Sequence, residues 1–246
     1  MSEFAVILPA AGSSTRFGGL EKKPFTSLDG RPIWLRSCEL FWTRPDVSRV
    51  YIVIAPDDGE VFRARFGHLL LFANAEIVEG GAERFESVAN ALDKVPAEVP
   101  FVAVHDAVRP LVTSRQIDAV FAKARETGAA MLGVPLADTL KRVEGEIVRG
   151  TVPRAGLWQA QTPQVFRRDW LVEAYANRGN LGTAITDDAQ LLEAGGRAVA
   201  MVPGTAANFK ITTQDDLALA EAVVRSRAKP VEEKPPARGF GDEAEW

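Results

Sequence analysis

A short apolar run passes abruptly into small residues near the start of the chain, in the stretch Val6-Ile7-Leu8-Pro9-Ala10-Ala11-Gly12-Ser13-Ser14-Thr15-Arg16-Phe17-Gly18. The apolar part is typical of a buried strand. The small residues after it leave backbone N–H groups uncovered by bulky side chains, and such a surface can cradle a phosphate chain. Lys22 and Lys23 follow closely, so positive charge lies beside the loop. The stretch therefore predicts a strand that ends either in a phosphate-binding loop or in a solvated turn.

Length and composition are those of an ordinary globular protein. The 246 residues suit one large domain or two small ones, with 46% hydrophobic and 25% charged residues. A net charge of −4 argues against nucleic acid as a partner, because non-specific nucleic-acid binding uses a basic excess. No apolar run could span a bilayer and no signal-peptide pattern is present, so we expect no membrane partner. The single cysteine, Cys38, fits a reducing compartment, and we expect a cytoplasmic protein.

Strand and helix patterns alternate along the first half of the chain. Apolar runs predict strands at 4–8, 50–55, 76–78, 101–104 and 131–134. Helical spacing predicts helices between them, at 33–42, 56–70, 83–94 and 114–127, and Ser114 is predicted to cap the last of these. This alternation indicates a Rossmann-like α/β fold with a doubly wound, mostly parallel sheet.

The second half continues the pattern after an interruption at 137–156. There, two polar segments on either side of Glu144-Gly145 predict a projecting β-hairpin. Such a hairpin is either a lid or an arm that embraces another subunit, and we favour an arm that makes a homodimer. Later residues predict an extended segment at 157–166, helices at 168–177, 186–193 and from 213, and strands at 198–202 and 208–211.

The C-terminal residues 228–246 are rich in Pro, Lys and Glu and poor in large apolar side chains. They predict a disordered tail, too short for a fused second enzyme domain. We therefore expect residues 1–227 to form a single domain with the arm at 137–156.

Several enzyme classes lack their motifs in this sequence. The first loop has neither the Gly-x-Gly-x-x-Gly spacing of dinucleotide binders nor the spacing of a P-loop. The chain has only two histidines, His68 and His105, and one cysteine, too few for a structural zinc site. The Gly-x-Ser-x-Gly elbow that is typical of a hydrolase is also absent from the sequence. What remains is a set of cations in loops: Arg16, Lys22, Lys23, Arg84, Arg109, Arg154 and Lys210.

These cations and one acid are expected to meet at a single edge of the sheet. In doubly wound sheets, ligands bind at the carboxyl ends of the strands, where the first loop, Gly80-Gly81 and the segment 106–109 all lie. Asp106 amid many bases suits a Mg²⁺–polyphosphate complex, in which the phosphates supply most of the metal ligands. For any single cation, a solvated surface is the alternative.

The motifs recur in the order and spacing of a known family from residue 4 to about 225. They are Pro9-Ala10-Ala11-Gly12 with Arg16 and Lys23, Gly80-Gly81 with Arg84 and Ser87-Val88, Val104-His105-Asp106-Ala107-Val108-Arg109-Pro110, Arg154 before Leu157-Trp158-Gln159-Ala160-Gln161-Thr162-Pro163-Gln164, Thr186-Asp187-Asp188-Ala189, and Lys210-Ile211-Thr212-Thr213. As a set they resemble the 2-C-methyl-D-erythritol 4-phosphate cytidylyltransferases of the non-mevalonate isoprenoid pathway. The first loop alone indicates only the wider nucleotidyltransferase superfamily.

Two positions depart from the family's pattern. The family usually has Pro-Lys-Gln before an aromatic residue, where this chain has Lys22-Lys23-Pro24-Phe25. The spacing from Arg16 favours Lys23 over Lys22 as the catalytic lysine. The family also often has glycine at the position of Ser14.

The resemblance implies an enzyme, a nucleotidyltransferase that joins CTP to methylerythritol phosphate with Mg²⁺ as cofactor. It gives catalytic roles to Arg16, Lys23, Arg154 and Lys210. It implies that CTP is held by Pro9, Ala10, Ala11, Gly12, Ser13, Gly81 and Ser87. It places Asp106, Ala107, Arg109, Thr162 and Thr186 around the polyol phosphate, with Asp106 also at the metal. Family members are homodimers, so Arg154 is expected to serve the partner's site.

Two other functions stay open at this level. A cytidylyltransferase for another polyol phosphate, such as ribitol 5-phosphate, is the nearer alternative, because it would differ mainly in polyol contacts around Asp106 and Thr186. A catalytically silent nucleotide-binding protein that associates through the arm is the other, and the retained cations argue against it.

Overall fold

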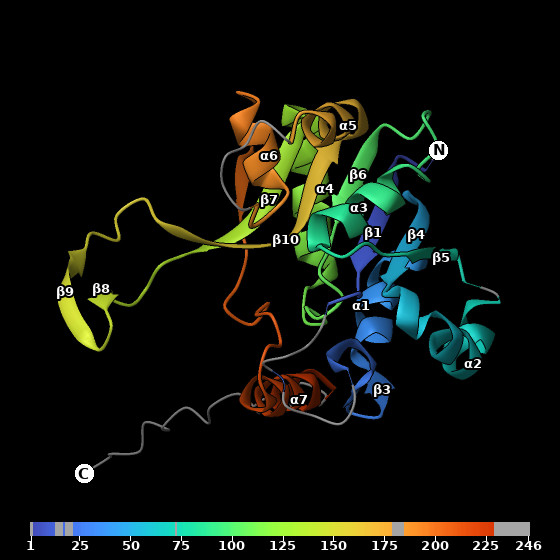
Figure 1. Cartoon of the computed structure of the whole chain (residues 1–246), viewed down its shortest axis with the longest axis horizontal. Helices are drawn as coiled ribbons and strands as arrows, with labels where there is room; N and C mark the ends of the chain where they lie inside the picture. Colours follow the sequence, from blue (N-terminus) through green and yellow to red (C-terminus); the bar gives the residue numbers. More distant parts are fainter. Residues whose placement is uncertain (1, 13–16, 18–21, 72, 179–184, 229–246) are drawn as a thin grey trace, which may run out of the picture.

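A seven-stranded sheet forms the centre of the computed structural model of this chain, which describes residues 2–12, 17, 22–71, 73–178 and 185–228 (Figure 1). The strand order is β11-β7-β10-β6-β1-β4-β5. Neighbouring strands pair in parallel except at β10, which runs antiparallel to both β6 and β7. The strands are β1 (Phe4–Pro9), β4 (Val47–Ile54), β5 (Ala75–Glu79), β6 (Phe101–Val104), β7 (Ala129–Pro135), β10 (Trp158–Arg167) and β11 (Ala200–Pro203). The predicted mostly parallel α/β fold is confirmed.

Both faces of the sheet are covered by helices, which explains why β1 is apolar throughout. Phe4, Val6 and Leu8 join one core cluster, and Ala5 and Ile7 join the other. Because side chains alternate across a strand, a strand covered on both sides needs apolar residues at every position. The first face packs against α1 (Ile33–Trp42), α2 (Gly59–Leu70) and α4 (Ser114–Thr127), and the second against α3 (Arg84–Leu92), α5 (Arg168–Ala176) and α6 (Ala189–Ala194).

A third apolar cluster attaches the last helix, α7 (Gln214–Ala228), to a small hairpin of β2 (Ser27–Leu28) and β3 (Arg31–Pro32). The hairpin turns through Asp29 and Gly30, whose φ angles are 48° and 80°. Two positive φ angles in a two-residue loop favour the sequence Asp-Gly, which this chain has at the turn. The short helices η1 (Lys23–Phe25) and η2 (Pro56–Asp58) complete the fold.

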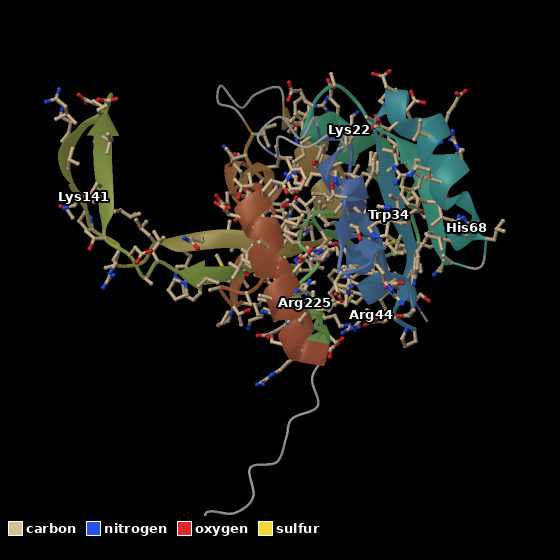
Figure 2. All side chains as sticks on the ribbon, turned by 90° about the horizontal axis from the view of Figure 1, so that it is seen from below. Lys22, Trp34, Arg44, His68, Lys141 and Arg225 are labelled. Carbon is tan, nitrogen blue, oxygen red and sulfur yellow. The ribbon has the colours of Figure 1, made fainter. Side chains whose placement is uncertain are left out.

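The predicted hairpin at 137–156 projects from the body of the molecule (Figures 1 and 2). Among the described residues, its strands β8 (Leu140–Glu144) and β9 (Ile147–Val152) pair only with each other. Figure 2 shows Lys141 on this arm, set apart from the other labelled residues. The arm lies in the connection between β7 and β10, so it leaves and rejoins the sheet at neighbouring strands.

Three local predictions were wrong at their boundaries or in kind. Helix α4 is capped by Thr113, not Ser114, because the Thr113 hydroxyl accepts the N–H of Gln116. Helix α6 begins at Ala189 and not at residue 186, because the polar residues before it cap it: Asp187 Oδ1 accepts the N–H of Gln190 at 3.1 Å. Residues 208–211 form no strand, since the Ile211 N–H donates to the Val108 carbonyl in the loop after β6 at 3.0 Å and the segment joins no ladder among the described strands.

The predicted tail at 228–246 lies outside the described residues except for Ala228, which ends α7. The assignment of 1–227 to one domain stays a prediction. Among the helices in the part of the chain that the structure describes, none is long and apolar enough to cross a membrane.

Candidate functional site

A pocket of about 360 Å³ lies at the carboxyl end of β1, where the sequence places its loop of small residues. The backbone there is held by the sheet: Ala10 N–H donates to the Val53 carbonyl at 2.8 Å. The pocket is lined by Pro9, Ala10, Ala11, Gly12, Lys23, Pro24, Gly81, Ala82, Glu83, Arg84, Ser87, Asp106, Val108 and Lys210. Of the predicted site residues, Ser13 and Arg16 lie outside the described residues.

The loop after β5 approaches the first loop closely, and glycine makes this approach possible. A Cβ on Gly80 would lie 2.8 Å from Ser87 Oγ and 2.9 Å from the Ala11 side chain. Gly81 donates its N–H to Ser87 Oγ at 3.1 Å, and Ser87 is almost fully buried. Ser87 on α3 therefore fixes the glycine loop against the wall of the pocket.

Asp106 follows β6 and lies among three cations. Its Oδ2 is 3.1 Å from Lys210 Nζ and 3.3 Å from Arg109 Nε. Its Oδ1 is 3.6 Å from a terminal nitrogen of Arg84. Burial by itself raises the pKa of Asp106, but the charges of Lys210, Arg84 and Arg109 outweigh burial and hold the pKa well below its ordinary value. The carboxylate is therefore ionised at neutral pH and orients cations that face the pocket.

His105 is fully buried behind Asp106 and does not line the pocket. Its Nε2 lies 3.1 Å from the Arg109 carbonyl oxygen, which only accepts, so Nε2 carries the proton. Its Nδ1 lies 3.1 Å from Thr162 Oγ1, which also accepts the Asp106 N–H at 3.0 Å. Burial lowers the pKa of His105 to about 4, so the ring is neutral at pH 7. The neutral ring accepts from the Thr162 hydroxyl and braces the Asp106 loop.

The two adjacent lysines have different surroundings. Lys22 Nζ forms an ion pair with Asp58 Oδ2 of η2 at 2.7 Å. Lys23, the first residue of η1, lines the pocket. Phe25 at the other end of η1 packs against Phe62 of α2, with ring centroids 5.7 Å apart. The geometry thus turns Lys22 toward η2 and leaves Lys23 on the pocket wall, in line with the spacing argument.

The remaining predicted residues lie behind or beyond the pocket. Ala107 is buried under it, while Arg109 and Thr162 contact Asp106 as described above. Thr186 is exposed before α6, and its hydroxyl donates to Gln190 Oε1 at 3.1 Å. Arg154 is exposed at the base of the arm and is not part of the pocket wall of its own chain.

Two residues without an individually predicted role also shape the pocket. Arg84 opens α3 and lines the pocket, and the buried Asp188 forms an ion pair with it at 2.8 Å. Both residues lie in motifs that the family shares. From the sequence, however, Arg84 was one member of the set of loop cations, and Asp188 was one acid at the start of a predicted helix. The position of Arg84 could have indicated its place in the pocket, because it is the first helical residue after the Gly80-Gly81 loop.

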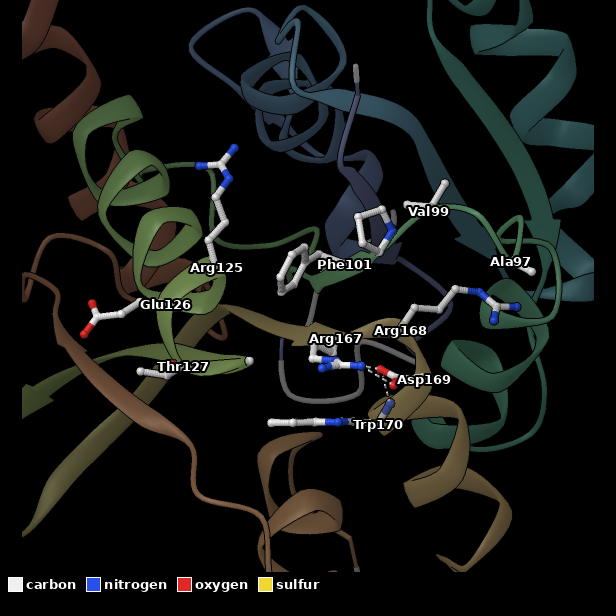
Figure 3. Close-up of a pocket in the computed structure, with 12 residues that line it drawn as sticks. Ala97, Val99, Phe101, Arg125, Glu126, Thr127, Arg167, Arg168, Asp169 and Trp170 are labelled. Atoms are coloured by element: carbon white, nitrogen blue, oxygen red, sulfur yellow. Dashed lines mark hydrogen bonds and ion pairs between the residues drawn. The ribbon is translucent and has the colours of Figure 1, made fainter.

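A larger cavity of about 560 Å³ lies elsewhere, at the amino end of β6 and the carboxyl end of β10 (Figure 3). Its basic side chains already form ion pairs or hydrogen bonds with other residues of the chain. Arg167 pairs with Asp169 at 2.6 Å, Arg168 donates to the Val95 carbonyl at 3.0 Å, and Arg125 pairs with Glu3 at 2.7 Å. The smaller pocket, where loops of small residues meet the cations around Asp106, is therefore the candidate active site.

The comparison with known proteins agrees with this geometry. Residues 4–226 match the family model described as 2-C-methyl-D-erythritol 4-phosphate cytidylyltransferase. The chain belongs to this family. A member from Rhodopirellula baltica with that name is 41% identical in an alignment 231 residues long, which covers 89% of this chain and 94% of the relative. A crystal structure of the Thermus thermophilus enzyme of that name superposes with a TM-score of 0.76 at 36% identity, covering 90% of this chain and 98% of the other.

Some cytidylyltransferase relatives are longer than this chain. A Rhodospirillum rubrum protein named bifunctional enzyme IspD/IspF is 43% identical over 230 residues, which are 93% of this chain but only 59% of that protein. The match therefore covers the cytidylyltransferase part of such relatives. Within the family, the chain is a nucleotidyltransferase enzyme, and its mostly parallel sheet is that of the solved members.

Proposed function

We propose that the protein transfers the cytidylyl group of CTP to 2-C-methyl-D-erythritol 4-phosphate, giving 4-diphosphocytidyl-2-C-methyl-D-erythritol and pyrophosphate. The observation that carries this proposal is the pocket at the carboxyl end of β1, where a small-residue loop meets Lys23, Arg84, Asp106 and Lys210. A phosphate oxygen of the acceptor attacks the α-phosphorus of CTP. The bond from the α-phosphorus to the bridging oxygen breaks, and pyrophosphate leaves.

The main barrier to this reaction is electrostatic, because two highly charged anions must meet. Lys23 and Lys210, both on the pocket wall, are assigned to the negative charge that grows at the α-phosphate, together with Arg16. Asp106 keeps Lys210 in place at 3.1 Å before the phosphates arrive. Such a preorganised arrangement accelerates phosphoryl transfer mainly by positioning and charge stabilisation.

The reaction requires no general base. A phosphate monoester has its second pKa near 6 and is largely dianionic at neutral pH, so the nucleophile is already deprotonated. This fits the pocket, since His105 is buried behind it with a pKa lowered to about 4.

We assign CTP to the two loops at the carboxyl ends of β1 and β5. Pro9, Ala10, Ala11, Gly12 and Gly81 line the pocket, Ser87 supports Gly81, and Ser13 continues the first loop in the sequence. The acceptor is assigned to the side of Asp106, with Ala107, Arg109, Thr162 and Thr186.

We infer that a divalent cation, Mg²⁺ in the first instance, enters with the triphosphate. Within the described residues, no three His, Cys, Asp or Glu side chains are grouped so that they could hold a metal. Asp106 is a carboxylate on the pocket wall, but its oxygens already face Lys210, Arg109 and Arg84. These residues fit a metal held chiefly by phosphate oxygens, with Asp106 as a protein ligand. When bound, the cation neutralises phosphate charge.

We propose that the arm joins two copies of the chain. Val143, Ile147 and Val148 on the arm are 51%, 58% and 57% exposed in the single chain. Three large apolar side chains on one hairpin are unusual on a surface in water, and a second copy would cover them. In such a dimer, Arg154 at the base of the arm would reach the partner's acceptor site. The cytoplasmic location stays a prediction.

Pyrophosphate release from CTP and Mg²⁺ tests the function directly. We expect release with 2-C-methyl-D-erythritol 4-phosphate and much slower release with ribitol 5-phosphate, an acceptor that the family match does not favour. Faster release with ribitol 5-phosphate would change the assigned acceptor. Binding of CTP without product from either acceptor would leave only the silent nucleotide-binding protein.

A further inference from the structure

Arg84 joins the loop assigned to CTP to two carboxylates on the side assigned to the acceptor. It begins α3, three residues after Gly81, and its Nη2 lies 3.6 Å from Asp106 Oδ1 and 2.8 Å from Asp188 Oδ2. Asp106 lines the pocket, and Asp188 stands two residues after Thr186, in the loop assigned to the acceptor. Arg84 and Asp188 are 104 positions apart in the chain, so this contact exists only because of the fold.

Asp188 is held tightly for a residue that does not line the pocket. It is 1% exposed, and its Oδ1 accepts the Tyr175 hydroxyl of α5 at 2.6 Å. Its N–H donates to Gln164 Oε1 of β10 at 3.2 Å. Burial, together with the charge of Asp188, raises the pKa of Tyr175 well above its ordinary value, so the hydroxyl remains a donor at neutral pH.

A buried carboxylate without a partner is costly, so Asp188 and Arg84 must stay together. Any movement of the residue 185–188 loop that carries Asp188 therefore displaces the Arg84 guanidinium. Arg84 also lines the pocket and faces Asp106. The displacement therefore reaches the groups assigned to CTP and, through Asp106, the Lys210 ammonium. Arg84 cannot optimise its contacts with both carboxylates independently.

We propose that Arg84 and Asp188 are positioning residues that couple the acceptor loop to the nucleotide pocket, so that acceptor binding changes the affinity for CTP through the shared guanidinium. This inference rests on the proposed function, because it assigns the two sides of the site to the two substrates. Coupling between two ligands is reciprocal, so it can be measured from either one.

The test is the effect of 2-C-methyl-D-erythritol 4-phosphate on the Kd of a CTP analogue with a methylene bridge between the α- and β-phosphorus, which cannot react. Calorimetry on the full chain with Mg²⁺ gives the Kd with and without saturating acceptor. The ratio of the two is the coupling factor. We expect about fivefold or more in the unaltered protein, and a factor near one in Asp188→Asn, which keeps the shape of the side chain but not its charge.

Two further variants separate coupling from general damage. Arg84→Lys keeps the positive charge, but its ammonium sits on a shorter side chain and does not reproduce the position of Nη2 between the two carboxylates, so it should also lose the coupling. Asp187→Asn is the matched control, because Asp187 contacts Gln164 and Gln190 but not Arg84, and it should keep the full factor. General damage to the site would raise both Kd values and leave their ratio unchanged.

The inference is overturned if the unaltered protein shows no coupling, or if Asp188→Asn and Arg84→Lys keep its full value. If Asp188→Asn does not fold, Tyr175→Phe replaces it. This variant removes only the hydrogen bond to Asp188 and should lower the factor in part, and an unchanged factor there contradicts the inference. Pyrophosphate release by the unaltered protein is measured in parallel, so that failure of the proposed function is recognised separately.

Discussion

At the scale of single residues, the two neighbouring lysines show how a fold assigns different tasks to identical side chains. Lys22 is paired with Asp58 at 2.7 Å on the outer side of η1, and its side chain is 37% exposed. An ion pair this exposed contributes little, on the order of 0–1 kcal/mol. Lys23 instead lines the pocket, where charge develops during the proposed reaction.

Alanine substitution should therefore separate the two lysines. Lys23→Ala is expected to lower kcat by about 10²–10³, the usual loss when one group at a developing charge is removed. Lys22→Ala is the matched control and should stay close to the unaltered rate. Steady-state pyrophosphate release checks both, and a collapse of kcat in Lys22→Ala with a normal Lys23→Ala would reverse the assignment.

His105 is the other residue whose surroundings make a measurable prediction. Its pKa falls from 6.5 to about 4 on burial, so the unfolded chain takes up the proton first as the pH falls. The folded state therefore has its full stability above about pH 6.5 and loses it toward pH 4. Between pH 7 and pH 5, His105 should account for a loss of about 2 kcal/mol in the free energy of unfolding.

Urea unfolding at pH 7 and pH 5 tests this. His105→Gln retains a donor toward the Arg109 carbonyl but does not titrate, so the difference between the two pH values should shrink. An equal pH dependence in the unaltered protein and in His105→Gln would contradict this prediction.

At the scale of elements, the start of α4 shows why a cap is hard to place from sequence. Thr113 and Ser114 are adjacent and both could cap a helix. The structure uses Thr113, because its hydroxyl and the Gln116 side chain satisfy each other's backbone N–H groups. The residue that is chosen depends on where Gln116 falls, three positions later.

The two candidates should differ in stability when replaced. Thr113→Ala is expected to lower the free energy of unfolding by about 1 kcal/mol, because it leaves a helix N–H unsatisfied. Ser114→Ala, at an exposed first position of the helix, should be nearly neutral. Urea denaturation curves of the two variants decide between them, and equal losses would remove the distinction.

At the scale of the whole molecule, the proposed dimer through the arm decides whether one chain would make a complete site by itself. The resemblance gives Arg154 a catalytic role, and Arg154 lies at the base of the arm and outside the pocket wall of its own chain. A dimer through the arm explains both observations, because the arm then carries Arg154 to the partner.

Mixing two inactive variants tests this assignment. Arg154→Ala and Lys23→Ala should each be nearly inactive alone. When they are unfolded and refolded together, one site of each mixed dimer keeps Lys23 from one chain and Arg154 from its partner, so activity should return. Arg154→Ala refolded alone is the control. No recovery, with mixed dimers shown by sedimentation, would place Arg154 in the site of its own chain.

Much of the site could be predicted because its residue types are local signals. The small residues after β1, the glycines after β5 and the acid after β6 all follow apolar strands, and parallel strands bring their carboxyl ends together. The segment 208–211 was predicted wrongly as a strand for a related reason. Its apolar pattern reflects burial, as Ile211 is fully buried, but its backbone finds no neighbouring strand.

By itself, the sequence determined the alternation of strands and helices, the projecting hairpin and the candidate residues, because periodicity and turn chemistry act over a few residues. Only the tertiary structure decided which of these residues meet. The insertion of β10 between β6 and β7 brings Thr162 to Asp106, and the packing of α6 brings Asp188 to Arg84. Such contacts depend on the assembled sheet, whose strand order no local pattern encodes. The same holds for Lys22, which meets Asp58 only when η1 and η2 lie side by side.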